Sequence, residues 1–121
     1  MIKIRLAVIE SIVMASQNTF PDEFISLLGV DREGIISELV VLPAVFGSNF
    51  SSVRMDLVPF DRKVIGSIHS HPSHNNRPSQ GDLHVFSRMG KVHFIICMPF
   101  NLNSLKAYNV KGLELPFEVI E

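Results

Sequence analysis

The sequence is poor in the residues that mark several large protein classes. Its 121 residues include no tryptophan and one cysteine, and no apolar run approaches the roughly 20 residues of a transmembrane helix. The single cysteine, Cys97, excludes an intrachain disulfide, and its position inside an apolar run favours a buried small side chain over a catalytic thiol. The N-terminal segment also lacks the pattern of a secretory signal, so we expect a cytoplasmic protein.

The sequence has no excess of charge of either sign. Eleven Lys and Arg residues face 12 Asp and Glu residues, which gives a formal net charge of -1, and the basic residues are scattered along the chain. This composition predicts no nucleic-acid partner and no membrane partner. With 46% hydrophobic residues the chain can form a compact core, and its length predicts a single domain over residues 1–121.

The hydrophobic pattern predicts two helices and about seven strands. A helix over 6–19 is indicated by a stripe that includes Ile9, Ile12 and Val13, and a second helix over 79–89 is ended by Gly90. The predicted strands cover residues 24–30, 35–42, 53–58, 64–71, 92–98, 104–110 and 113–120. The fold class is therefore α/β or α+β, with helices packed on a mixed sheet.

Three candidate metal ligands lie close together in the middle of the sequence. His69 and His71 are one residue apart at the end of a predicted strand, so the alternation of strand side chains places both on one face. Asp82 follows one turn into the second helix and can face back toward them. Three such ligands leave one position of zinc open, which is typical of a catalytic site, and the ion would lower the pKa of a water molecule there to about 7.

Ser79 and Asp82 also have a structural interpretation. Ser79-Gln80-Gly81-Asp82 is the pattern of a helix N-cap with an acidic residue at the third helical position. Taken alone, the pair is more typical of a cap than of a catalytic site. The two roles are compatible because a carboxylate has two oxygens, so we expect one oxygen to bind metal while the other accepts from backbone N–H.

The joint pattern resembles the signature of a known family. Seven residues separate His71 from Ser79 and two separate Ser79 from Asp82, which matches the JAMM (MPN+) metalloproteases at every fixed position. Glu23 resembles the glutamate that this family carries upstream. Since 121 residues leave no room for the insertions with which eukaryotic members grip ubiquitin chains, the sequence is most similar to a minimal prokaryotic, archaeal-like member.

The resemblance implies a fold, a metal and an activity. The fold is a curved mixed sheet flanked by helices, of the cytidine-deaminase-like type. One zinc ion per chain is implied on His69, His71 and Asp82, with Glu23 as general base and Ser79 as stabiliser of the oxyanion. The implied activity is that of a peptidase or isopeptidase that removes ubiquitin or a ubiquitin-like modifier from proteins.

Several points stay open at the level of the sequence. Asp22 competes with Glu23 for the role of base, and only the family pattern favours Glu23. The extended tail of a modifier could pair with strand 53–58 or contact the loop after His71. Exposed strand edges and the apolar first helix are compatible with a homodimer.

Other readings of the histidines compete with the zinc peptidase. His69, His71 and His74 approximate the ligand run of metallo-β-lactamase-type hydrolases, but Ser73 occupies the position of a required aspartate and the chain is too short for that fold. A non-catalytic MPN scaffold is the third class, and it is disfavoured because all five signature residues are present. His74, His84 and His93 lie outside the signature, and we expect none of them to bind metal; His93 should face solvent or satisfy a hydrogen bond in the core.

Overall fold

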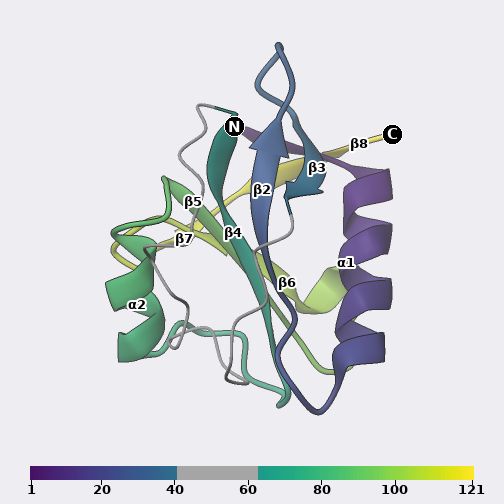
Figure 1. Cartoon of the computed structure of the whole chain (residues 1–121), viewed down its shortest axis with the longest axis vertical. Coiled ribbons are helices and arrows are strands. Elements are labelled where there is room, and N and C mark those ends of the chain that lie inside the picture. The colour runs from purple at the N-terminus through teal and green to yellow at the C-terminus, as the bar shows by residue number, and fades with distance from the viewer. Residues whose placement is uncertain (41–62) are drawn as a thin grey trace.

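An eight-stranded mixed sheet with one helix on each face makes up the part of the chain that the computed structural model describes, residues 1–40 and 63–121 (Figure 1). The elements follow in the order β1 (Ile2–Arg5), α1 (Leu6–Thr19), β2 (Ile25–Val30), β3 (Ile36–Val40), β4 (Val64–His71), α2 (Gln80–Phe86), β5 (Val92–Cys97), the 3-10 turn η3 (Leu102–Ser104), β6 (Leu105–Tyr108), β7 (Glu114–Leu115) and β8 (Phe117–Ile120). The predicted strand 53–58 lies outside the described residues.

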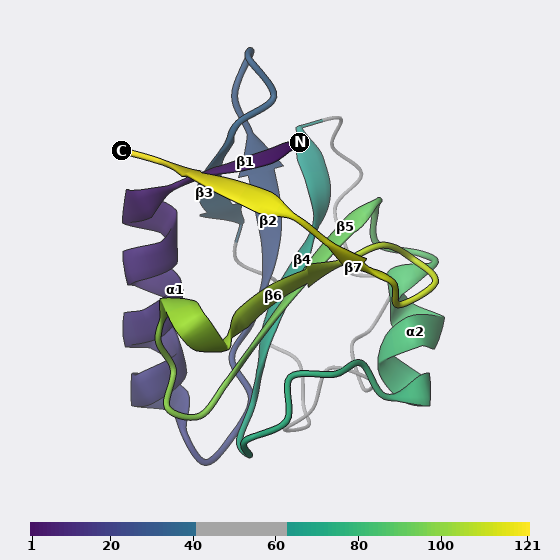
Figure 2. The ribbon, with the colours of Figure 1, turned by 180° about the vertical axis from the view of Figure 1, so that it is seen from behind.

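The order of strands across the sheet is β7-β6-β5-β4-β2-β3-β1-β8. The two outermost strands, β7 and β8, are neighbours in the chain and are joined through Pro116. Figure 2 shows β8 lying along β1 while β7 leads directly into it. The sheet therefore curls until its two edges are linked by a single residue, and the result is a curved and nearly closed sheet of the kind expected for the family.

Most predicted elements are confirmed, and the structure differs from the prediction at three places. The strand expected over 113–120 is divided into β7 and β8, because Pro116 has no N–H to donate to a neighbouring strand. Strand β1 was not predicted, although it pairs in parallel with both β3 and β8. The second helix is also shorter than the predicted range 79–89. It ends at Phe86, and the chain continues to Met89 in turns whose hydrogen bonds join residues three apart.

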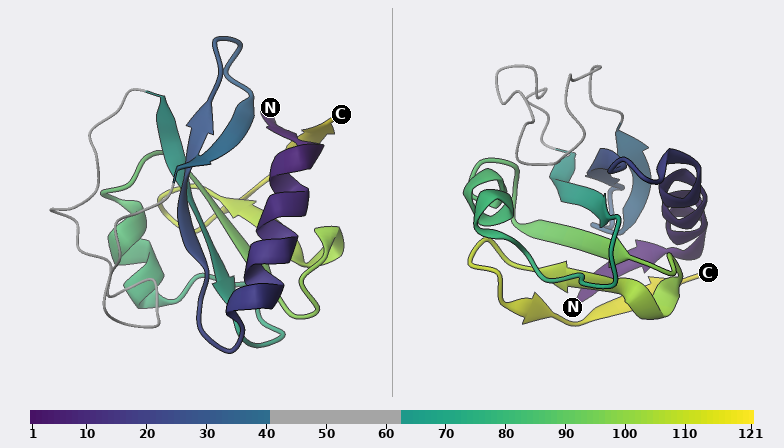
Figure 3. Two further views of the ribbon diagram at one scale, coloured as in Figure 1. Left: turned by 45° about the vertical axis from the view of Figure 1, so that its right-hand side comes forward. Right: turned by 90° about the horizontal axis from the view of Figure 1, so that it is seen from below.

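The two faces of the sheet carry separate hydrophobic clusters. On one face, α1 packs against a cluster that includes Leu28, Ile68 and Phe94. On the other face, α2 packs against a cluster that includes Leu27 and Ile95. These two residues are next to Leu28 and Phe94 in the chain, and adjacent strand residues point to opposite faces. The helices thus flank the central strands from either side (Figures 1 and 3). Neither helix in residues 1–40 and 63–121 is long and apolar enough to cross a bilayer.

Candidate metal centre

The two histidines of the signature come from the end of the central strand β4. β4 is paired on both sides, antiparallel to β2 and parallel to β5, so its backbone is fixed. Ile68 belongs to the cluster on the α1 face, which leaves His69 and His71 on the face covered by α2. His69 is fully buried, whereas His71 is half-buried at the strand terminus. Asp82, in the first turn of α2, reaches both imidazoles.

The three side chains meet at one point. His69 Nε2 lies 3.0 Å from His71 Nε2, and Asp82 Oδ2 lies 3.1 Å from His71 Nε2 and 3.3 Å from His69 Nε2. Tetrahedral zinc with bonds of about 2.0–2.1 Å holds its ligand atoms roughly 3.3–3.4 Å apart. The triangle of ligand atoms therefore has close to the dimensions that a zinc ion requires, and the predicted grouping of the three residues is confirmed.

The tautomer of His71 also suits ligation. Its Nδ1 lies 2.8 Å from the backbone carbonyl of Asn75, and a carbonyl can only accept, so Nδ1 carries the hydrogen. In the neutral His71 ring, Nε2 then carries a lone pair that points at Asp82 Oδ2. The ionised carboxylate has no hydrogen to donate, so two acceptors face each other. These atoms repel each other unless a cation lies among them, and the cation is either a proton or a metal ion.

The charges of the three groups are strongly coupled. Burial by itself raises the pKa of Asp82, but hydrogen bonds from His69 and His71 outweigh it and hold that pKa far below its usual range. Complete burial lowers the pKa of His69. Burial also acts to lower the pKa of His71, yet the bond to Asp82 and the Asn75 carbonyl prevail and raise it. The imidazoles shift in opposite directions because His69 is fully buried, whereas His71 is only half-buried and has the Asn75 carbonyl as a further partner.

Asp82 and Ser79 form the predicted cap, with one correction. The Ser79 hydroxyl accepts from the Asp82 N–H at 3.0 Å, and the Ser79 N–H donates to the Asp82 carboxylate at 3.0 Å, which completes a capping box. In the structure the two contacts do not fall on separate oxygens of Asp82. One atom, Asp82 Oδ2, accepts from the Ser79 N–H and also faces both histidines, because the first turn of α2 places this oxygen between Ser79 and the two imidazoles.

Glu23 reaches the site through the register of β2 and β4. Ile25 lies opposite His69 in this antiparallel pair. Phe24 extends the pairing, because its carbonyl accepts from the Ser70 N–H at 2.9 Å and its N–H donates to Ser70 Oγ at 2.8 Å. The same register sets Glu23 opposite His71, and opposed residues share a face. The Glu23 charge accordingly contributes to the raised pKa of His71.

Ser70 is a site residue whose role the sequence analysis missed. Its backbone and its side chain both hold Phe24, the residue after Glu23. Ser70 is buried on the α1 face, between two histidines that point the other way. The signal in the sequence was a polar residue on the face of the strand that Ile68 shares, because a buried polar side chain requires a hydrogen-bond partner.

The remaining histidines and Cys97 lie outside the triangle. His74 and His84 are exposed. His93 satisfies a hydrogen bond in the core, as one of its two expected roles required: its Nε2 donates to the Gly90 carbonyl at 3.0 Å and its Nδ1 accepts from Ser67 Oγ at 2.7 Å. Cys97 is buried, as predicted, and burial raises the pKa of its thiol.

Comparison with known proteins agrees with the geometry of the site. The family model of prokaryotic homologs of the JAB domain matches residues 6–111. A probable metalloprotease of Haloferax volcanii is 37% identical over 117 residues, covering 88% of this chain and 72% of the relative. A JAB1/MPN domain protein from Archaeoglobus fulgidus is 42% identical, with 99% of this chain and 100% of that chain covered and a TM-score of 0.80.

A further solved structure is described as JAMM, a metalloprotease-like zinc site in the proteasome and signalosome. It is 39% identical to this chain and has a TM-score of 0.81. The match covers 100% of this chain and 99% of that chain. The likeness thus extends over the whole fold and not only over the signature. His69, His71 and Asp82 form a group able to bind one zinc ion. The chain belongs to the JAMM metalloprotease family, among the prokaryotic homologs of the JAB domain.

Proposed function

We propose that this chain is a zinc-dependent isopeptidase that hydrolyses peptide or isopeptide bonds and releases ubiquitin or a ubiquitin-like modifier from proteins. The observation that carries the proposal is the convergence of His69, His71 and Asp82 on one point, with the Glu23 charge close enough to act on His71. A buried, coupled ligand group beside a further carboxylate is typical of hydrolytic sites.

Each residue has a defined part in this proposal. His69, His71 and Asp82 hold the zinc ion, which when bound acts as a Lewis acid and lowers the pKa of water. Glu23 takes a proton from the attacking water and delivers it to the leaving amine as the C–N bond breaks. The Ser79 hydroxyl donates to the oxygen of the tetrahedral intermediate. Ser79 is exposed and its oxygen accepts from the Asp82 N–H, so its O–H is left to donate to a substrate.

The choice of substrate rests on the relatives. The similar solved structure is described for the proteasome and signalosome, which supports conjugates of a protein modifier as substrates. The complete ligand group disfavours a non-catalytic scaffold. The homodimer and the cytoplasmic location expected from the sequence stay predictions, and strand 53–58, one expected contact of the modifier, lies outside the described residues.

The decisive experiment is incubation with a modifier-conjugated protein, with and without a zinc chelator. We expect release of the modifier that the chelator abolishes and added zinc restores. Glu23→Gln should retain zinc and lose cleavage by orders of magnitude, because only proton transfer is removed. Cleavage that survives in Glu23→Gln would move the role of base to another residue such as Asp22, and cleavage that survives the chelator would reject a zinc hydrolase.

A further inference from the structure

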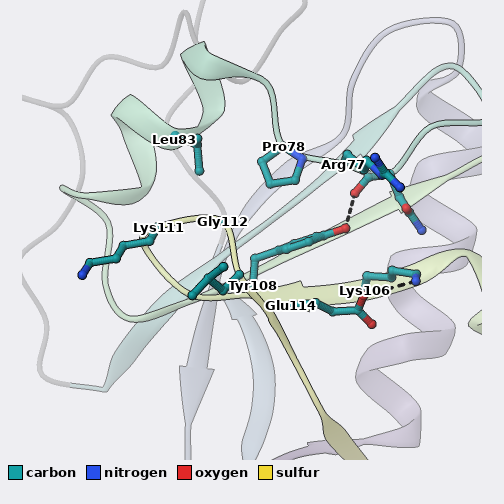
Figure 4. A pocket seen from close by; sticks show the side chains of 10 residues that line it. Arg77, Pro78, Leu83, Lys106, Tyr108, Lys111, Gly112 and Glu114 are labelled. Carbon is teal, nitrogen blue, oxygen red and sulfur yellow. Dashed lines mark hydrogen bonds and ion pairs between the residues drawn. The ribbon is translucent and has the colours of Figure 1, made fainter.

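A groove with a cationic lining lies beside the metal centre, where α2 faces the β6–β7 hairpin. It encloses about 440 Å³. Arg77 lines it from the loop before α2, and Lys106 and Lys111 line it from the β6–β7 hairpin (Figure 4). Glu114 is the only acidic residue among the lining residues in 1–40 and 63–121. Lys106 pairs with Glu114 at 3.3 Å. Arg77 and Lys111 are exposed and form no ion pair within the described part of the chain.

The floor and walls of the groove are rigid. Tyr108 forms the floor, and its hydroxyl donates to the Asn76 carbonyl at 2.7 Å. The Asn76 side chain donates in turn to the Ser104 carbonyl at 3.0 Å, so the loop that carries Arg77 is bound both to β6 and to η3. On the other side, a side chain added at Gly112 would lie 2.7 Å from Leu83 of α2. The hairpin therefore packs directly on the helix, and the groove exists before any ligand binds.

The groove is continuous with the metal centre along the chain. Pro78 in its wall directly precedes Ser79, and Leu83 directly follows Asp82. Across the sheet, Lys106 lies opposite Ile95, and Ile95 lies opposite His69. Lys106 is thus two strands from His69 on the same face, which is about 10 Å. A chain segment of a few residues can span the distance from the groove to the metal centre.

We propose that this groove binds an acidic segment of the protein substrate and so aligns the scissile bond with the metal centre. The inference extends the proposed peptide hydrolysis by naming the chemistry of its substrate. Two unpaired cations select carboxylates by charge complementarity, while Tyr108, Pro78 and Leu83 offer apolar contacts to the peptide between them. A peptide fits better than a nucleic acid, because the cations line a short groove on a chain of formal net charge -1 and form no extended basic surface.

Binding without turnover tests the proposal independently of the hydrolytic activity. The probes are two fluorescein-labelled peptides, one with four consecutive glutamates and one with four glutamines, measured by fluorescence anisotropy on Glu23→Gln protein. We expect the glutamate peptide to bind about tenfold more tightly at low salt, and Arg77→Glu and Lys111→Glu, each added to that background, to remove most of the difference. The matched control is Arg32→Glu, the same charge reversal at an exposed position in the β2–β3 turn, which should change affinity less than about twofold.

Three outcomes would overturn the proposal. Equal binding of the two peptides would remove the charge selectivity, and equal losses in Arg77→Glu and Arg32→Glu would show a general charge effect. Tighter binding of a single-stranded RNA oligonucleotide, lost in Arg77→Glu, would assign the groove to nucleic acid. Failure of the hydrolase proposal is separate, because it appears as uncleaved conjugate with zinc-loaded wild-type protein while peptide binding is unchanged.

Discussion

At the scale of single residues, the burial of His69 makes it the most sensitive ligand. His69 is the fully buried member of the three-ligand group, and His69→Ala removes its ligand atom. We expect zinc to fall from about one ion per chain to near zero, because two ligands do not define a zinc site. Elemental analysis after dialysis measures this. The control is His84→Ala at an exposed position of α2, and zinc that persists in His69→Ala would reject the ligand assignment.

His93 gives the metal-free protein a defined pH dependence. Burial lowers the pKa of His93 to about 4, although the Gly90 carbonyl opposes it. In the unfolded chain the pKa is about 6.5, so between roughly pH 6.5 and 4 the unfolded state binds a proton that the folded state does not. The free energy of unfolding should therefore fall as the pH is lowered through this window, by up to about 3 kcal/mol from this residue.

Urea denaturation in the presence of a chelator, at a series of pH values, measures this dependence. His93→Gln lacks the titrating group and should show a shallower fall than the wild type between pH 6.5 and 4.5. Parallel curves for the two proteins would show that His93 is not the group responsible.

The residues of the site were predictable to different degrees. His69 and His71 follow from the alternation of a strand, and Asp82 from a helix that returns to it. Glu23 did not follow from the residues alone, because its closeness to His71 depends on the register of β2 against β4, and register is set by long-range pairing. Oδ2 of Asp82 could not be chosen over the other oxygen without the geometry of the cap.

At the scale of elements, Ser70 couples β4 to the segment that carries Glu23. In Ser70→Ala the Phe24 N–H loses its acceptor, which costs about 1–3 kcal/mol of stability. We expect zinc content to be retained and cleavage to fall about tenfold or more, because the proposed base is no longer held in place. The measurements are zinc content, denaturation and the rate of modifier release.

Ser26→Ala is the matched control for this prediction. Ser26 is equally buried, lies on the neighbouring strand and donates to the Val40 carbonyl at 3.1 Å, away from Glu23. It should lose stability without the loss of rate. Equal rates in Ser70→Ala and Ser26→Ala would remove the positioning role from Ser70.

Gly66 controls the contact between β4 and β5. A Cβ at this position would lie 1.5 Å from the Val92 carbonyl oxygen, so Gly66→Ala forces the two backbones apart. We expect the free energy of unfolding to fall by about 3 kcal/mol or more, which is at or above the upper end of the range for substitutions that overpack a core. Gly34→Ala is the control, since Gly34 has a φ of 78° and nothing within 4 Å of its added Cβ, and backbone strain alone should cost about 1–2 kcal/mol. Chemical denaturation distinguishes the two, and equal losses would contradict the clash.

The elements themselves were largely predictable because helix and strand periods are local properties. β1 was missed because its four residues run directly into α1 without a turn, and it is a strand only by virtue of its pairing with β3 and β8. The early end of α2 is likewise a tertiary effect, since Met89 remains buried in the core after the helix has ended.

At the scale of the whole molecule, closure of the sheet depends on β8. Phe117 packs edge-to-face on Phe94 of β5, with ring centroids 5.2 Å apart. Phe117→Ala removes this contact, and we expect a loss of about 2–3 kcal/mol, less than for a fully buried ring because Phe117 is half-buried. Met14→Ala, at a side chain that is 64% exposed, should change stability by less than about 0.5 kcal/mol. Thermal unfolding compares the variants, and equal midpoints would mean that β8 adds little to the fold.

The cationic groove shows what the sequence could not predict at this scale. Arg77 is far along the chain from Lys106 and Lys111, and the composition gives no sign of a basic site. They come together because β6 and its hairpin pair beyond β5, next to the loop that follows β4.

The pairing of β1 with β8 also orders events during synthesis of the protein on the ribosome. β1 is made early, yet one of its two partners, Phe117–Ile120, is made after every residue of the proposed hydrolytic centre, from Glu23 to Asp82. A nascent chain that has exposed the centre still has an open sheet, with one edge of β1 unpaired. We therefore expect the metal ligands to emerge on an incomplete scaffold, and the sheet that supports them to close after β8 has left the ribosome.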